Sequence, residues 1–183
     1  MASERDIRDL VRRVVDEIST SDAEGSKTSG SGDQIAIGAD HGGFTLKELL
    51  IGRLRDQGFS VQDCGTKGPD SVDYPDYAVA VAELVADGTC RWGVVVDGAG
   101  IGSCMAANKI PGVRAALCYD ISSARNSREH NHANVLTLGA SLIGEGLAYQ
   151  IMDAWLATDW GPGRHARRVE KIDQIDQQYR RAG

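Results

Sequence analysis

The 183-residue sequence lacks a long apolar run, an excess of positive charge and any close pair of cysteines. No run approaches the roughly 18 apolar residues that span a bilayer, and acidic residues interrupt the N-terminus where a signal peptide would have an apolar core. The formal net charge of −6 argues against a nucleic-acid or anionic-membrane binder, because both rely on a cationic field. We therefore expect a soluble, cytoplasmic protein with neither kind of partner.

The sequence also gives little indication of a metal site or a disulfide. The four cysteines are widely separated, with no C-x-x-C pair, and the four histidines include no H-x-x-x-H pair. These spacings favour neither a zinc site nor a disulfide framework. We expect reduced, mostly buried thiols, no metal and no cofactor.

Residues 1–33 differ in kind from residues 34–183, which we expect to form one domain. Apolar residues recur at helical spacing along 3–18 and predict an amphipathic helix, and residues 19–32 have the composition of a flexible linker. A short helix on such a tether is stabilised mainly by a partner. The partner is either another protein, or the chain's own domain or a sister subunit. The stripe consists of Ile7, Leu10, Val11, Val14, Val15 and Ile18.

From Gln34 onward, apolar β-branched runs alternate with helical patterns. Strands are predicted over 34–39, 59–63, 92–96, 113–118 and 134–138, and helices over 44–57, 75–86, 144–156 and 164–179, with a further one starting near Ile121. Strands joined by helices of ten or more residues imply right-handed crossovers. The pattern predicts an α/β fold, a doubly wound five-stranded parallel sheet with helices on both faces.

The stretch from Val94 to Lys109 combines a strand, a glycine-rich turn and a helix start. Asp97 ends the apolar run, and Gly98, Gly100 and Gly102 follow at alternate positions. Such glycines let backbone N–H groups approach a bound anion closely. Many doubly wound proteins have a similar turn for packing alone, so the surrounding residues must decide between the two interpretations.

Polar side chains follow the predicted strands. Asp40 and His41 come after the first strand and Asp97 after the third, and ligands of such sheets bind at the carboxyl ends of strands. His130 and Asn131 close the helix before the fifth strand. The final helix opens with a cationic cluster that suits a phosphate, because arginine forks pair with phosphate oxygens. The cluster consists of Arg164, His165, Arg167 and Arg168, and its alternative is a solvated helix face.

A sugar-phosphate isomerase needs a phosphate clamp, a ring-opening acid, a proton-transferring base and donors for an enediolate oxygen. The chain offers His41, Arg164 and Arg168 as the clamp, His130 as the acid, and the amides from Gly98 to Ser103 as the donors. Asp97 is the obvious base on the central loop. Its alternative role is purely structural, as a helix-capping acid.

The motifs together resemble the ribose-5-phosphate isomerase B family, which includes the galactose-6-phosphate isomerase subunits. They are Gly38-Ala39-Asp40-His41-Gly42-Gly43-Phe44-x-Leu46-Lys47, Asp73-Tyr74-Pro75, Gly98-x-Gly100-Ile101-Gly102-x-x-x-Ala106-Ala107-Asn108-Lys109, Arg128-Glu129-His130-Asn131 and Gly163-Arg164-His165-x-x-Arg168, in family order over residues 34 to about 175. The resemblance implies a Rossmann-like domain, a homodimer or tetramer with sites at the subunit interface, no metal, and aldose–ketose interconversion of a phosphorylated sugar, with ribose 5-phosphate the first candidate.

By position, the resemblance implies that Asp40 binds sugar hydroxyls and that the phosphate is bound by His41, Arg164 and Arg168. Tyr74 would line the pocket, and His130 with Asn131 would serve ring opening and oxygen binding.

The sequence departs from the family at the catalytic base. Many relatives have a cysteine where this chain has Asp97, and others have a glutamate at the place of Ser103. Relatives usually have a Thr or Ser two residues after the cysteine, where this chain has Ala99. They usually have an arginine after the fifth strand, where this chain has Ser141. Four readings stay open: Asp97 is the base, Cys104 is the base, the chain binds without turnover, or another base serves a changed substrate.

The N-terminal helix and linker lie outside this core. They resemble the encapsulation peptides that direct enzymes into bacterial microcompartments, which implies a shell protein as partner of residues 3–18. The alternative is a cargo scaffold whose main role is assembly.

Overall fold

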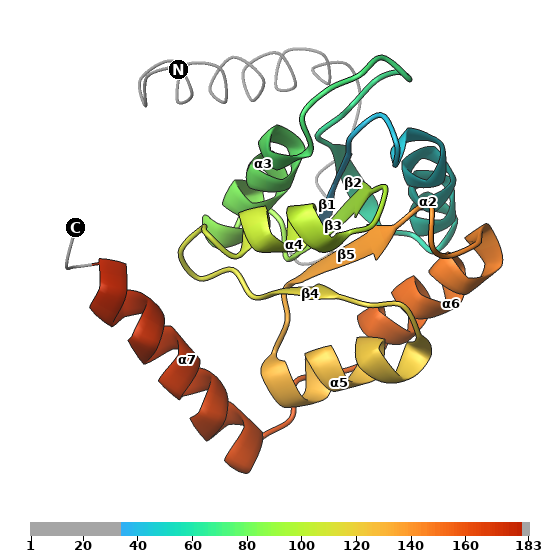
Figure 1. Cartoon of the computed structure of the whole chain (residues 1–183). Helices are drawn as coiled ribbons and strands as arrows, with labels where there is room; N and C mark the ends of the chain where they lie inside the picture. Colours follow the sequence, from blue (N-terminus) through green and yellow to red (C-terminus); the bar gives the residue numbers. More distant parts are fainter. Residues whose placement is uncertain (1–33, 181–183) are drawn as a thin grey trace.

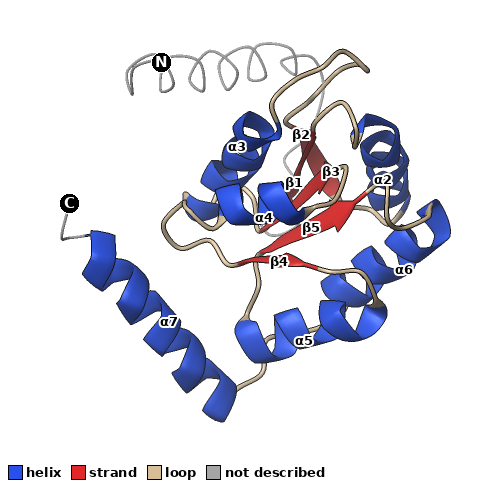
Figure 2. Ribbon diagram, viewed as in Figure 1, coloured by secondary structure: helices blue, strands red, loops and turns tan. Residues whose placement is uncertain are grey.

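The computed structural model describes residues 34–180, which form one five-stranded parallel sheet flanked by helices (Figures 1 and 2). The strands are β1 (Gln34–Ala39), β2 (Ser60–Asp63), β3 (Trp92–Asp97), β4 (Ala115–Leu117) and β5 (Val135–Gly139). The helices are α2 (Phe44–Asp56), α3 (Tyr74–Ala86), α4 (Ile101–Ala107), α5 (Ile121–Asn131), α6 (Glu145–Leu156) and α7 (Arg164–Arg180). The predicted helix and linker of residues 1–33 lie outside the described residues.

The strand order is β2-β1-β3-β5-β4. The chain leaves β1 toward one side of the sheet and β3 toward the other, so the order reverses between these two strands. In doubly wound sheets this reversal opens a crevice at the carboxyl ends of the strands. The turns after Ala39 and Asp97 both lie there, as the sequence predicts.

Two apolar layers cover the sheet, one on each face. Val94 and Val96 face the layer formed by α2, α5 and α6, whereas Val95 faces the layer that includes α3 and the end of α4. The alternation follows from the two-residue period of a strand, and continuous apolar runs are expected when both faces are buried. All six residues of β3 are buried, so the strand that carries the glycine-rich turn is held on both sides.

Local sequence explains where several helices begin. Pro75 occupies the first turn of α3, where its missing N–H costs no hydrogen bond. Asp120 caps α5 by accepting a hydrogen bond from Ser123 N at 2.7 Å. Gly100 precedes α4 with a φ of 76°, a left-handed conformation that favours glycine.

The strand boundaries differ from prediction mainly at β4 and β5. Residues 113–118 were expected to be strand, but β4 covers only Ala115–Leu117. The Asn134 side chain binds the backbone that precedes β4. Its Oδ1 accepts a hydrogen bond from Arg114 N at 2.8 Å, and its Nδ2 donates one to Gly112 O at 2.9 Å. Backbone hydrogen bonds from Asn134 N and Val135 N to Arg114 O lie beside these side-chain bonds, so Asn134 joins the two segments just before the β4–β5 ladder begins.

Helix α7 extends away from the sheet and packs against α5 (Figure 1). Val169 is its one buried residue. Arg114 reaches α7 through an ion pair with Asp173, at 3.0 Å. Across residues 34–180, no helix combines the length and the apolar character that crossing a membrane requires.

Candidate active site

The Asp97 carboxylate organises the glycine-rich turn after β3. Its Oδ1 accepts hydrogen bonds from the amides of Ala99, at 2.8 Å, and Gly100. Its Oδ2 accepts from Ser103 N at 3.0 Å and from Ser103 Oγ at 2.5 Å. The side chain is buried, and the four hydrogen bonds match the roughly four lone-pair sites of a carboxylate. Asp97 therefore shapes the turn, the structural role that the sequence left open beside catalysis.

These bonds also determine which amides of the turn are available to a ligand. The sequence predicts that N–H groups from Gly98 to Ser103 hold an anionic oxygen, but Asp97 already occupies those of Ala99, Gly100 and Ser103. Among residues 34–180, no acceptor is bonded to the amides of Gly98 and Gly102. These two N–H groups are the donors that the turn can offer to a ligand.

The turn after β1 lies directly against the glycine-rich turn. Asp40 is buried, and its Oδ1 accepts from Gly43 N at 2.9 Å. A Cβ added to Gly42 would lie 3.3 Å from Asp40 Oδ1 and 3.5 Å from Gly98 N. One added to Gly43 would lie 2.2 Å from Val96 O, so only glycine permits this approach. Asp40 and the open Gly98 amide therefore share the crevice at the strand-order reversal.

His41 and Tyr74 border the same crevice. His41 is exposed, and its Nδ1 accepts a hydrogen bond from Val72 N at 3.3 Å, which ties the loop before α3 to the β1 turn. Tyr74 is 40% exposed. A Cβ on Gly102 would lie 2.5 Å from its ring, so the absence of a side chain at Gly102 makes room for the tyrosine.

Cys104 points away from this crevice. Its Sγ lies 3.4 Å from Ala115 O of β4 and 3.6 Å from Asn108 Nδ2. Advancing one residue along a helix turns the side chain by about 100°, which accounts for its direction relative to buried Ser103. The geometry disfavours Cys104 as the proton carrier.

A second group of candidate residues gathers where α5 ends and α7 begins. The rings of His130 and His165 stack with centroids 4.1 Å apart, and Arg164 Nε donates to His165 Nε2 at 3.3 Å. Asn126 Nδ2 lies 2.8 Å from His130 Nδ1 and Asn131 Nδ2 lies 3.2 Å from Asn126 Oδ1. Burial, followed by the nearby charges of His130 and Arg164, lowers the pKa of His165. The cationic cluster expected from the sequence is present, and Arg164 and Arg168 are exposed.

The two groups lie at opposite ends of the strands, so they do not meet within one chain, and the site at the subunit interface that the resemblance implies stays a prediction. His130 and Asn131 precede β5, whereas Ser141, which follows β5, donates its backbone N–H to Gly98 O at 2.9 Å. Five residues of β5 at about 3.3 Å each separate the two edges by roughly 16 Å. A ligand that touches both groups must therefore bridge two chains.

Sequence reasoning gives no role to two residues, of which Tyr119 supports the turn after β3 and Lys47 joins α2 to the end of β2. Tyr119 Oη donates to Ala99 O at 2.7 Å and fixes the turn from the β4 side. Lys47 is fully buried, and its Nζ donates to both carboxylate oxygens of Asp63 at 2.8 Å. Lys47 lies in the quoted motif region but falls on the buried face of α2, where a lysine is unexpected without a partner. Within residues 34–180, no three His, Cys, Asp or Glu side chains are arranged to hold a metal ion.

Comparison with known proteins places this chain among sugar-phosphate isomerases. The family model described as Ribose/Galactose Isomerase matches residues 35–172. Ribose-5-phosphate isomerase B of Escherichia coli strain K12 is 44% identical over 144 residues, which are 79% of this chain and 97% of that protein. D-erythrulose-4-phosphate isomerase of Pectobacterium atrosepticum is 40% identical over 146 residues, 79% of this chain and 95% of that protein.

Solved structures agree in fold. Ribose-5-phosphate isomerase B of Clostridium thermocellum superimposes with a TM-score of 0.79 at 49% identity, covering 80% of this chain and 99% of that one. The enzyme of Mycoplasma genitalium with bound ribulose-5-phosphate gives a TM-score of 0.77 at 38% identity, covering 79% and 96%.

Proposed function

We propose that this chain, which belongs to the ribose/galactose isomerase family and is a sugar-phosphate isomerase, interconverts ribose 5-phosphate and ribulose 5-phosphate through an enediolate. The observation that carries the proposal is the crevice at the strand-order reversal. Buried Asp40 and the open amides of Gly98 and Gly102 line it, with His41 and Tyr74 at its rim.

Each residue of the crevice has a role that fits its chemistry. Asp40 accepts hydrogen bonds from sugar hydroxyls, and His41 contacts the phosphate. The amides of Gly98 and Gly102 donate to the enediolate oxygen as negative charge develops on it. Gly100 and Ser103 contribute through the turn that Asp97 holds.

We assign proton transfer to Asp97. Its carboxylate becomes available as a base when the Ser103 hydroxyl gives up its hydrogen bond to Oδ2. The base must take the proton from C2 of the open-chain aldose and return it to C1, while a proton moves from the oxygen on C2 to the one on C1. Of the four donors to Asp97, the Ser103 hydroxyl alone can rotate away without moving backbone. Its rotation exposes one lone pair of Oδ2 to the substrate.

A second copy of the chain would supply the remaining groups. Arg164 and Arg168 fall within about 80° of Ile172, Ile175 and Tyr179 around α7, at 100° per residue. The three apolar side chains are 47%, 57% and 72% exposed, an unusual face for a helix without a partner.

An apolar counterpart lies beside the crevice of each copy. Ile101 and Met105 on α4 are 46% and 64% exposed, one turn apart. Packing α7 of one copy against α4 of another would bring its arginines to the partner's crevice. We therefore propose a homodimer, or a tetramer built from it, in which His130 opens the ring, Asn131 binds an oxygen and the two arginines clamp the phosphate.

Steady-state kinetics with ribose 5-phosphate test the reaction and the base together. Asp97→Asn is expected to lower kcat by about 10²–10⁴-fold, the usual contribution of a general base. Ser103→Ala keeps the carboxylate and should retain kcat within a few-fold. Asp120→Asn is the matched control, because it makes the same chemical change at an exposed cap and should act like wild type.

Binding of ribose 5-phosphate, followed by calorimetry, shows whether Asp97→Asn remains folded and competent to bind. Full activity of Asp97→Asn would refute the base assignment. A wild-type protein that binds sugar phosphates but turns over none with five or six carbons would instead be a catalytically silent binder. That alternative draws support from the absence of the family's usual cysteine or glutamate and from the fully hydrogen-bonded Asp97.

We further propose that residues 3–18 anchor the enzyme to a shell protein inside a cytoplasmic bacterial microcompartment. The support is the apolar stripe and polar linker of the sequence, which lie outside the described residues. A chain lacking residues 1–33 should keep its turnover and lose co-purification with shell proteins. Unchanged partitioning would refute the anchor, and a full-length chain that binds shell proteins but turns over no sugar phosphate would favour a scaffold.

A further inference from the structure

The side chain of Asn126 joins two residues to which a role in sugar binding is proposed above. Asn126 lies one turn before His130 on α5, and its Nδ2 lies 2.8 Å from His130 Nδ1. Residues four apart on a helix are neighbours, which accounts for this contact. Asn131 Nδ2 lies 3.3 Å from Asn126 O and 3.2 Å from Asn126 Oδ1. One amide therefore contacts both of the groups that α5 offers to a substrate.

A backbone carbonyl fixes the direction of each hydrogen bond in this network. Asn126 O can only accept, so the atom of Asn131 that faces it is the amide nitrogen. The same nitrogen donates to the side-chain oxygen of Asn126, which leaves the side-chain nitrogen of Asn126 facing His130 Nδ1. His130 Nδ1 is therefore an acceptor, and the proton of the neutral imidazole is on Nε2.

The groups that face His130 from its own helix and from α7 leave this Nε2–H group open. Glu129 Oε1 lies 3.8 Å from His130 Nε2, which is too far for a hydrogen bond. The His165 ring stacks on the face of His130, with centroids 4.1 Å apart, and Arg164 Nε donates to His165 Nε2. Within residues 34–180, no acceptor takes a hydrogen bond from His130 Nε2, so this donor can serve a ligand.

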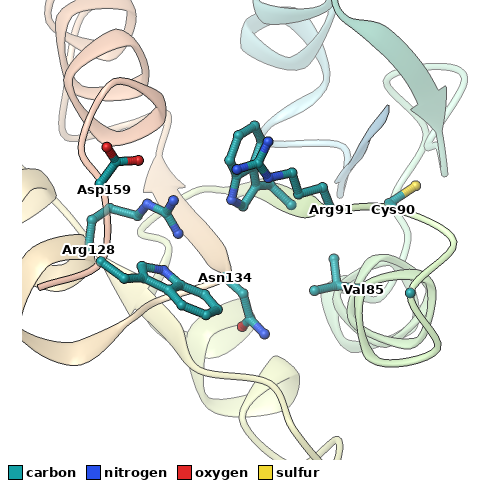
Figure 3. Close-up of a pocket in the computed structure, with 9 residues that line it drawn as sticks. Val85, Cys90, Arg91, Arg128, Asn134 and Asp159 are labelled. Carbon is teal, nitrogen blue, oxygen red and sulfur yellow. The ribbon is translucent and has the colours of Figure 1, made fainter. Parts of the chain in front are cut away.

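The helix that carries the network is anchored on its opposite side. Arg128 is two residues from both Asn126 and His130, so its side chain leaves the other side of α5. The side chain is buried and projects toward the cavity shown in Figure 3. Its Nε donates to Thr158 O at 3.1 Å and its Nη1 to Ala133 O at 2.6 Å. These bonds hold α5 in place while the Asn126 amide orients the exposed side.

We propose that Asn126 is a positioning residue for ring opening, an inference that rests on the proposed function. Asn126 holds His130 with the proton on Nε2 and leaves Asn131 Oδ1 to accept a hydrogen bond from a sugar hydroxyl. As the bond between C1 and the ring oxygen breaks, His130 Nε2 gives its proton to that oxygen. It takes the proton of the C1 hydroxyl, whose oxygen becomes the carbonyl oxygen, so His130 begins and ends neutral.

Nitrogen NMR of the isotope-labelled full-length protein at about pH 9, where histidine is ordinarily neutral, reports which imidazole nitrogen carries the proton. The chain has four histidines, and the signals of His130 are those that disappear in His130→Gln. Wild type should show the proton on Nε2. Asn126→Asp should show it on Nδ1, because the carboxylate accepts from Nδ1 and still accepts from Asn131 Nδ2. A wild-type spectrum with the proton on Nδ1 would overturn the assignment, whether or not the protein turns over a sugar.

The pH dependence of turnover tests the consequence for the reaction. In Asn126→Asp, His130 Nε2 keeps a proton only while both ring nitrogens are protonated. Its kcat/KM with ribose 5-phosphate should therefore fall at least about tenfold between roughly pH 7 and 9, relative to Ser122→Asp. Ser122→Asp is the matched control, because it adds the same charge one turn earlier on an exposed part of α5, and its ratio to wild type should stay constant.

The two experiments separate this inference from the proposed function. A constant ratio of Asn126→Asp to Ser122→Asp across the pH range would overturn the positioning role, because a merely structural asparagine would lower turnover equally at each pH. A wild-type protein without turnover would refute the proposed function and the role in ring opening with it, while the spectrum alone would still decide the tautomer.

Discussion

The carboxylate of Asp97 offers the sharpest test of how the glycine-rich turn is held. Replacing it with asparagine keeps the shape but turns one acceptor oxygen into an NH₂ donor. The remaining oxygen can stay with the amides of Ala99 and Gly100, which places the new donor opposite Ser103. The Ser103 hydroxyl can rotate and accept, but the Ser103 N–H cannot.

The loss of unfolding free energy in Asp97→Asn follows from the hydrogen bonds that the substitution removes or weakens. One buried backbone N–H loses its acceptor, at about 1–3 kcal/mol, and the two bonds to Oδ1 lose their charge assistance, which roughly halves them. Together these changes should lower the free energy of unfolding by about 3 kcal/mol. Asp120→Asn should change it by less than about 0.5 kcal/mol, because asparagine and aspartate cap helices almost equally well.

Equilibrium unfolding in urea measures both variants, with the midpoint and the slope compared at one fixed protein concentration. A shift for Asp97→Asn no larger than that for Asp120→Asn would refute the reasoning, because the turn would then hold its shape without the charge. The same result would weaken the assignment of Gly98 and Gly102 as the open donors, since that assignment depends on Asp97 occupying the others.

Further predictions concern packing and pH. Gly100→Ala should cost well over 2 kcal/mol in unfolding free energy, because the new Cβ would lie 2.5 Å from Leu117 Cδ1 and 2.9 Å from Leu138 C; Gly112→Ala, with a similar φ of 78° and nothing within 4 Å, should cost only about 1 kcal/mol. Comparable losses of unfolding free energy in Gly100→Ala and Gly112→Ala would contradict the steric argument. The hydrogen bond from Arg53 lowers the pKa of Asp153 below its ordinary 3.8, so this carboxylate stabilises the fold above that pH and the benefit disappears as pH falls through the lowered value. The stability difference between wild type and Asp153→Asn, from urea unfolding across pH, should therefore be present at neutral pH and vanish in acid; a constant difference would show that charge is not its origin.

The sequence predicts the strands and most helices because the apolar runs are long and the turn residues between them are distinctive. It also places Asp40 and Asp97 correctly, since a residue that directly follows a parallel strand must lie at its carboxyl end. It does not predict that Asp97 is fully hydrogen-bonded, because a carboxylate followed by glycines fits a base and a cap equally well.

The sequence also implies that His130 and Arg164 lie apart from the turn after β3 within one chain. Both belong to motifs associated with one active site, yet His130 precedes β5 and so belongs to the other edge of the sheet. Chain direction alone implies this, whereas a motif records only which residues act together. The supporting contacts of Tyr119 and Lys47 depend on tertiary packing, and no local pattern marks them.

The sparse packing of α7 has a consequence for how the protein behaves on dilution. Burial of one valine contributes about 1.5–3 kcal/mol, and ordering 17 backbone residues costs several times more. The intrahelical hydrogen bonds of an isolated segment offset that cost only marginally. In the proposed dimer, amide hydrogen exchange in α7 should therefore quicken as the protein is diluted while exchange in β3 stays slow, so that the order of α7 becomes a property of concentration rather than of a single chain.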